Sequence, residues 1–208
     1  MSFRAAAGQY PRERQPEPLK EAPVIDLKPA CHRMAEVLAG ITDDQLTRPT
    51  PCTEYTVGDL IDHVDGAAVG FTAVARKEVG EQEDPPEPTA ANLGPGWRDA
   101  ARRHVRTLGE AWDDPAAWRG TATGAGLELP TELWGRIALT EMVVHGWDLA
   151  RATGQPFDLP EETLRACLDH VSGFVTEAPL PELWNPPVEV PADAPLLDRV
   201  VGLAGRTP

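Results

Sequence analysis

The sequence predicts an all-α protein, a bundle of four or five helices, and three observations lead to this. The 22 prolines leave five long stretches free of proline, and proline breaks helix interiors. These stretches carry apolar residues at the intervals of amphipathic helices. Residues 118–129 are instead rich in Gly and Thr, which suits a loop or a short hairpin. The proline-free stretches are 30–48, 52–84, 96–114, 131–155 and 161–178.

The second stretch has the clearest helix start. Thr56 is an expected N-cap, and Asp59 three residues later completes a capping-box pattern. Apolar residues then follow at helical spacing. Thr131 is the expected cap of the fourth helix. The fifth begins at Pro160, which suits a first helical turn, and continues with Leu164, Leu168 and Val171 at helical spacing.

Three segments do not suit helices. Residues 1–23 are polar and proline-dotted, so we expect a disordered or loosely attached arm. Residues 81–96 read as an exposed loop. Residues 179–195 contain six prolines and predict an extended C-terminal segment. The remaining chain, 24–208, is expected to form one domain, since its length suffices for a single core.

Composition excludes several classes of partner. The chain has 208 residues, of which 41% are hydrophobic and 25% charged, with a formal net charge of −14. An acidic surface does not suit nucleic acid or anionic lipid. No signal peptide or membrane-spanning run is visible. Three widely spaced cysteines form neither a disulfide framework nor a CxxC zinc pair, so we expect a cytoplasmic protein.

The most apolar helix, 131–155, carries an acidic and a basic group on one stripe. Glu141 and His145 are four residues apart, which places them on the same helix face, about 6 Å apart along the axis. A buried carboxylate is costly unless a basic side chain, a hydrogen-bond network or a metal ion compensates it. The spacing alone also fits a surface pair or a hydrogen-bonded core histidine.

His63 supplies a third donor in this hypothesis. It borders the apolar face of the second helix, and in an antiparallel bundle it would face the middle of the fourth. Two imidazoles and one carboxylate are a ligand set that leaves coordination positions open for water or substrate. Such donors suit zinc, nickel or iron(II), and the sequence alone does not choose among them.

Other residues are expected around this site. Asp148 is expected to support it from behind the ligands or to pair with Arg151, and a direct role as a ligand is the less favoured alternative. Trp134 and Trp147 are expected to line the core and the walls of a cleft nearest the metal. Cys52 lies in a turn near the expected mouth of the site, where we expect a structural role.

Two segments identify a family resemblance. "PTPCTEYTVGDLIDHVDG" (49–66) and "ELWGRIALTEMVVHGWDLARATGQPF" (132–157) resemble actinobacterial relatives of the N-terminal metal-binding domain of mycothiol-dependent maleylpyruvate isomerase. These proteins belong to the DinB-like superfamily. The closing segment "VPADAPLLDRVVGLAGRTP" (190–208) is also similar, so the resemblance covers about residues 24–208.

The resemblance implies a DinB-like four-helix bundle of up-down-down-up order, here with an extra C-terminal helix and an extended tail. It places the divalent metal ligands at His63, Glu141 and His145. It also implies a low-molecular-weight thiol cosubstrate, such as mycothiol. The chain is expected to be of the single-domain type, without the separate C-terminal domain of the full isomerase, which leaves the reaction itself open.

Three functions therefore compete. The leading one is a metal-dependent transferase or isomerase in which a small-molecule thiol attacks a small electrophile. The second is metal-assisted hydrolysis, which needs no thiol. The third is a non-catalytic bundle that binds a metal or small molecule. We expect no nucleic-acid or membrane partner, and a homodimer is compatible with the many apolar helix faces.

Overall fold

The computed structural model describes residues 24–78, 87–124, 126–177 and 186–208. The predicted helical class is confirmed, with one short hairpin beside the helices. The α-helices of this described part are α1 (Lys28–Gly40), α2 (Val57–Arg76), α3 (Trp97–Ala111), α4 (Thr131–Thr153), α5 (Glu161–Glu177) and α6 (Leu196–Leu203). Short 3-10 helices lie at Asp43–Gln45, Ala90–Asn92 and Pro115–Trp118. Strands β1 (Thr121–Gly124) and β2 (Leu127–Pro130) pair antiparallel.

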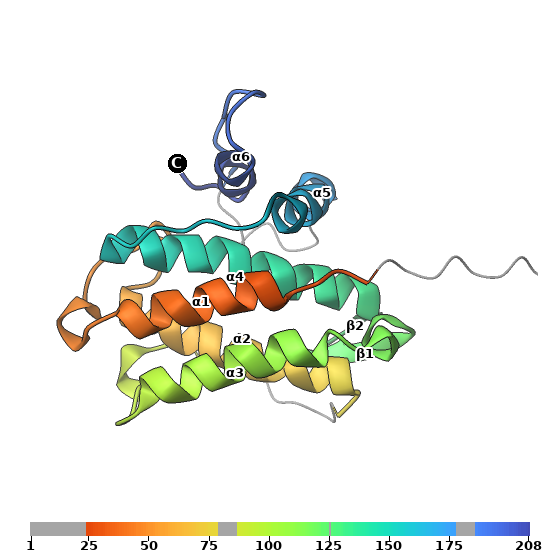
Figure 1. Cartoon of the computed structure of the whole chain (residues 1–208), viewed down its shortest axis with the longest axis horizontal. Coiled ribbons are helices and arrows are strands. Elements are labelled where there is room, and N and C mark those ends of the chain that lie inside the picture. Colours follow the sequence, from red (N-terminus) through yellow and green to blue (C-terminus); the bar gives the residue numbers. More distant parts are fainter. Residues whose placement is uncertain (1–23, 79–86, 125, 178–185) are drawn as a thin grey trace, which may run out of the picture.

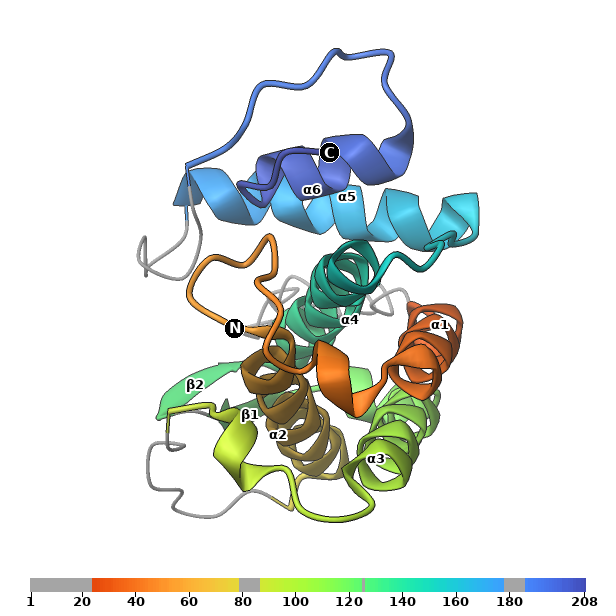
Figure 2. The same cartoon turned by 90° about the vertical axis from the view of Figure 1, so that its left-hand side faces the viewer.

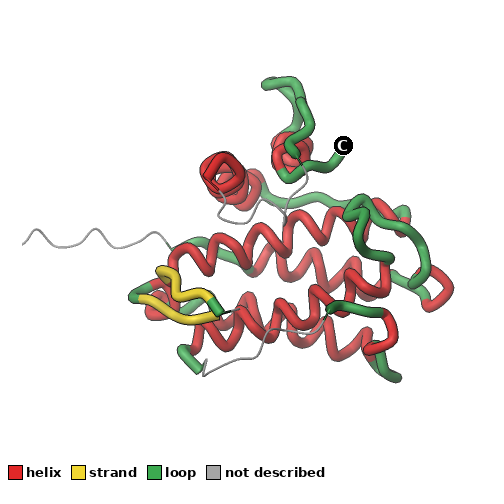
Figure 3. Tube along the Cα trace, turned by 180° about the vertical axis from the view of Figure 1, so that it is seen from behind, coloured by secondary structure: helices red, strands yellow, loops and turns green. Residues whose placement is uncertain are grey.

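Helices α1 to α4 form a four-membered bundle (Figure 1). Each packs against two of the others, so the order around the bundle is α1, α3, α2, α4 (Figure 2). The hairpin closes one end, as the view from behind shows (Figure 3). The two helices that carry the predicted metal ligands, α2 and α4, are therefore direct neighbours. The up-down-down-up order of directions stays a prediction.

The starts of α2 and α4 differ in how they are capped. The α2 prediction is confirmed: the Thr56 hydroxyl accepts from the Asp59 N–H, and the Asp59 carboxylate accepts from the Thr56 N–H. The α4 prediction is wrong, because Pro130 occupies the N-cap position and Thr131 is already helical. The Thr131 hydroxyl instead donates to the Gly120 carbonyl at 3.2 Å. This bond ties the start of α4 to the strand region.

The core is densest around α4, where almost every residue from Ala138 to Ala150 is buried. At its first turns α4 packs against two tryptophans that lie edge to face, Trp112 and Trp118, with ring centroids 5.0 Å apart. Both indole N–H groups donate to backbone carbonyls. A helix this uniformly buried has little room for polar side chains, so each one in its middle must find a partner.

A second layer lies on the outer side of α4. Helices α5 and α6 pack against each other, and α5 packs on α4 (Figures 1 and 2). Helix α6 lies beyond the five predicted helical stretches, in the segment that closes the chain. Residues 186–191, within the predicted extended segment, contain neither helix nor strand. The predicted arm, 1–23, and the part of the predicted loop before residue 87 lie outside the described residues.

Among the helices that the structure describes, none combines the length and the apolar character that crossing a membrane requires.

Candidate metal centre

Three side chains from α2 and α4 converge between the two helices. His63 Nε2 lies 3.0 Å from Glu141 Oε2, and His145 Nε2 lies 3.2 Å from the same oxygen. The four-residue spacing on α4 stacks Glu141 and His145 on one face. The neighbouring α2 brings His63 to that face. The predicted juxtaposition of these three residues therefore occurs in the structure.

The turn before α2 forms a wall beside His63. The Tyr55 ring stacks on the His63 ring, with centroids 5.7 Å apart and planes 19° from parallel. The turn is held by the Thr50 hydroxyl, whose contacts to the carbonyls of Cys52 and Tyr55 are both 2.8 Å. The His63 ring is also nearly perpendicular to the His145 ring, at 84°, with centroids 5.0 Å apart. His63 is thus oriented by two rings.

The cluster is open on one side and closed on the other. The exposed fraction of the side chain falls from 29% at His63 to 16% at Glu141 and 9% at His145. Asp148, behind His145, is fully buried. The solvent-exposed edge of the cluster is therefore at His63, whereas protein covers Asp148 behind His145.

Burial and charge oppose each other at the two α4 groups. Burial alone would raise the pKa of Glu141, but His145 and His63 outweigh it and lower that pKa well below its usual range. Burial likewise disfavours charge on His145, yet Glu141 and Asp148 raise the pKa of His145 to about 9. Without a metal, the cluster thus holds a carboxylate beside a protonated imidazole. A metal cation bound by His145 would have to displace that proton.

The donor chemistry fits a divalent cation. One nitrogen from each of His63 and His145 and one oxygen from Glu141 all lie within 4.8 Å of one another. His145 Nδ1 lies 3.0 Å from Asp148 Oδ2, a contact that directs the Nδ1 hydrogen to the carboxylate. Nε2, the nitrogen on the Glu141 side, is then the one with a lone pair available for a metal. The three side chains could hold zinc, nickel or iron(II).

A second set of potential metal ligands lies near the site, but its carboxylate already pairs with an arginine. Cys52, His145 and Asp148 also bring potential ligand atoms within 4.8 Å of one another. Here, however, Arg206 lies against both Asp148 oxygens, with Nε 3.3 Å from Oδ1 and Nη2 3.0 Å from Oδ2. The Asp148 carboxylate thus already has a positively charged partner, which makes this second group a poorer candidate for a cation site. The alternative that Asp148 pairs with Arg151 is wrong, since its partner is Arg206.

Comparison with known proteins agrees with this architecture. Residues 27–150 match the family described as the mycothiol maleylpyruvate isomerase N-terminal domain. The chain belongs to this family. Two uncharacterized proteins of Mycobacterium tuberculosis, from strains CDC 1551 / Oshkosh and ATCC 25618 / H37Rv, are each 31% identical to it over 191 residues. That alignment covers 89% of this chain and 98% of theirs.

Solved structures support the same fold. The crystal structure of the mycothiol-dependent maleylpyruvate isomerase superimposes with a TM-score of 0.56 at 19% identity, covering 73% of this chain and 69% of that one. A mutant of the same isomerase gives a TM-score of 0.56 at 18% identity, with the same coverage. The superpositions establish a shared fold. At sequence identities this low, the fold does not determine the reaction.

The isomerase-family match contains the whole predicted ligand set. The three predicted ligands, His63, Glu141 and His145, fall within residues 27–150, and so does Asp148 behind them. Arg206 lies outside it. Sequence reasoning missed Arg206, because no periodic pattern links it to a residue 58 positions earlier. The similarity of the closing segment to this family was the one signal that pointed there.

The two tryptophans expected beside the site have other partners in this isomerase-family domain. Trp134 donates from its indole N–H to the Ala122 carbonyl at 2.9 Å and packs against Phe71. It therefore belongs to the junction of α4 with the hairpin. The Arg151 guanidinium lies 6.0 Å from the Trp147 ring centroid. A role for either tryptophan as a cleft wall stays a prediction.

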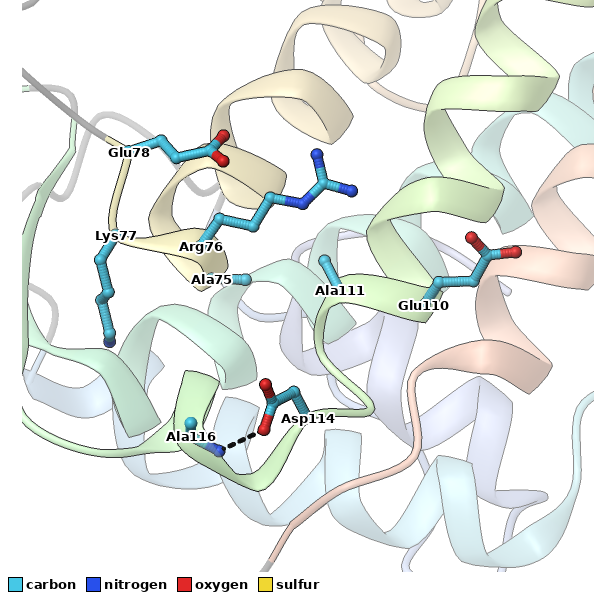
Figure 4. A pocket seen from close by; sticks show the side chains of 8 residues that line it. All are labelled: Ala75, Arg76, Lys77, Glu78, Glu110, Ala111, Asp114 and Ala116. Atoms are coloured by element: carbon cyan, nitrogen blue, oxygen red, sulfur yellow. Dashed lines mark hydrogen bonds between the residues drawn. The ribbon is translucent and has the colours of Figure 1, made fainter.

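A separate recess of about 540 Å³ lies at the far end of α2 (Figure 4). It begins at Ala75, which is about 18 Å along the helix from His63 at 1.5 Å per residue. Its lining contains none of the clustered ligand candidates. The residues that line it are Ala75, Arg76, Lys77, Glu78, Glu110, Ala111, Asp114 and Ala116.

Proposed function

We propose that this protein is a metal-dependent enzyme that activates a low-molecular-weight thiol, of the mycothiol type, for attack on a small electrophile. The observation that carries the proposal is the meeting of two imidazole nitrogens at one carboxylate oxygen, on a cluster open to solvent at His63. The family name points to mycothiol as the thiol. The reaction is a transfer or an isomerisation.

His63, Glu141 and His145 would hold the metal, with zinc expected first and nickel or iron(II) as alternatives. Three protein donors leave further coordination positions for a small molecule. When bound, such a metal lowers the pKa of a coordinated thiol so that the thiolate is available near neutral pH. Glu141 supplies the negative charge, and the two imidazoles fix where the cation lies.

The protein's own cysteines are poor candidates for the reactive thiol. Burial raises the pKa of the Cys31 and Cys167 thiols to about 12. Cys52, which is closest to the cluster, is half-buried, and its pKa is also raised by burial. A thiol with a raised pKa is mostly protonated and a weak nucleophile near neutral pH. The reactive sulfur is therefore assigned to a cosubstrate.

Net charge and the free cysteines support proposals about binding partners and cellular compartment. With a net charge of −14, the chain is expected to bind small molecules rather than nucleic acid or an anionic membrane. Three free cysteines suit a reducing, cytoplasmic compartment. Residues 24–208 are proposed as one metal-binding domain, and a homodimer remains compatible with it.

Metal content tests the proposed ligands. Wild-type protein, purified without a tag or chelator, should contain about one equivalent of zinc, nickel or iron, and His63→Gln should lose it. His104→Gln is the matched control, because His104 also pairs with a carboxylate, Asp65, at 2.7 Å, but on the α2–α3 contact. His104→Gln should keep the metal. A metal-free wild type after reloading would end the proposal.

Thiol dependence tests the reaction class. Turnover of model electrophiles should require both metal and mycothiol, and Glu141→Ala should abolish it. Activity on esters or amides without any thiol would point to metal-assisted hydrolysis instead. Full activity of Glu141→Ala would contradict both schemes.

A further inference from the structure

The C-terminal residues reach the back of the metal cluster. Arg206 lies just after α6, and its side chain is 3% exposed. Its guanidinium contacts both oxygens of Asp148, at 3.3 and 3.0 Å. Its remaining terminal nitrogen, Nη1, donates to the Ala204 carbonyl at 2.6 Å. The guanidinium is therefore fixed from two directions.

The segment that carries Arg206 is itself anchored. The backbone N–H of Val188 donates to the Gly202 carbonyl at 2.9 Å, and the Arg206 N–H donates to the Val201 carbonyl at 2.9 Å. Gly202 lies against Val190, where an added Cβ would collide with the valine side chain. The position of Arg206 thus depends on the packing of α6 rather than on a loose terminus.

Asp148 connects Arg206 to His145, one of the proposed metal ligands. Asp148 Oδ2 touches both Arg206 Nη2 and His145 Nδ1, each at 3.0 Å. Metal-binding histidines commonly donate the hydrogen of their other ring nitrogen to a carboxylate, which fixes the tautomer and the ring orientation. A buried carboxylate needs a counter-charge of its own to serve this purpose.

We infer that Arg206 is a positioning residue of the metal centre: it fixes Asp148, which in turn directs Nε2 of His145 toward the metal. The inference rests on the proposed metal site. It makes the C-terminal segment part of that site, although it comes from the outer layer and lies beyond residues 27–150. An arginine suits this role, because its planar fork reaches both carboxylate oxygens at once, which a lysine ammonium does not.

Metal affinity measures this role directly. Zinc dissociation constants by chelator competition should rise about 10- to 100-fold in Arg206→Met, the usual effect of losing such a supporting partner. Arg206→Lys should lose less, because it keeps the charge but not the two-oxygen contact. The visible spectrum of the cobalt(II)-loaded protein should change in Arg206→Met, since the coordination geometry at His145 relaxes.

Two further variants separate positioning from folding. Val105→Ala removes two buried methyl groups from α3, which lies across the bundle from α4, so it should destabilise the fold yet keep zinc affinity within about threefold. The double variant Asp148→Asn/Arg206→Met should bind zinc about as weakly as Asp148→Asn alone. Residues that act through one another give such non-additive effects.

The outcomes are distinct. Wild-type zinc affinity in both Arg206→Met and Arg206→Lys overturns the inference alone, as does an equal loss in Val105→Ala. If Arg206→Met does not fold, Arg206→Lys and the Asp148 pair of variants decide the matter. A wild type that binds no zinc overturns the proposed function and this inference together.

Discussion

His170, a buried histidine outside the proposed metal site, should make the free energy of unfolding depend on pH. His170 on α5 is 7% exposed. Burial, helped by the charge of Arg136, lowers the pKa of His170 from 6.5 to about 4. The folded protein therefore requires the neutral imidazole, whereas the unfolded chain takes up a proton below about pH 6.5. Protonation thus favours unfolding in this range.

The expected loss is measurable. As pH falls from 6.5 to 5, His170 should cost about 1–2 kcal/mol of unfolding free energy, and the loss should saturate near pH 4. His170→Gln should flatten the stability profile over this range in denaturant titrations at several pH values. Equal slopes in wild type and His170→Gln would contradict the assignment.

Residue chemistry also explains what the sequence could and could not reveal about the site. Glu141 and His145 were predictable, because a carboxylate inside an apolar helix demands a partner and the helical period shows which residue shares its face. His63 was predictable once two helices were assumed to pack. Arg206 was not, because its contact with Asp148 joins residues 58 positions apart that no local pattern connects.

At the scale of elements, proline positions located five of the helices. A proline-free stretch with apolar residues every three or four positions has few alternatives to a helix. Helix α6 is only eight residues long, too short for periodicity to identify it, and it depends on packing against α5. The prediction that Thr131 caps α4 was wrong for a similar reason. The Thr131 hydroxyl had a tertiary partner, Gly120, that local reasoning does not supply.

The contact of α4 with the two tryptophans leads to a matched pair of variants. At Gly135 an added Cβ would lie 2.7 Å from the rings of Trp112 and Trp118, whereas at Gly70 on α2 nothing lies within 4 Å. Gly135→Ala should therefore destabilise the protein by about 1–3 kcal/mol through overpacking. Gly70→Ala should stabilise it by about 0.5–1 kcal/mol, the usual gain of alanine over glycine in a helix.

Thermal or denaturant unfolding of both variants checks this prediction. The two substitutions are chemically identical and both lie inside helices, so helix propensity cancels between them. Stabilisation by Gly135→Ala would mean that the tryptophan pair yields easily, and the junction between α4 and the end of α3 would then be looser than the contacts indicate.

At the scale of the whole molecule, the proposed metal centre lies where the bundle meets its outer layer. Helices α2 and α4 supply the proposed ligands, while the segment after α6 supplies the charge that neutralises Asp148. Metal binding should therefore stabilise both layers together. A ligand that binds only the folded state adds about 2.7 kcal/mol at a hundredfold excess over its dissociation constant.

This linkage predicts a zinc-dependent melting temperature. For a chain of this length, 2.7 kcal/mol corresponds to a rise of about 5–11 °C, which calorimetry with zinc or with a chelator measures directly. Glu141→Gln should remove the zinc effect, because it takes the negative charge from between His63 and His145. His104→Gln should keep it. If zinc shifts Glu141→Gln as much as wild type, the cation binds elsewhere, and the stabilising site is not the one between α2 and α4.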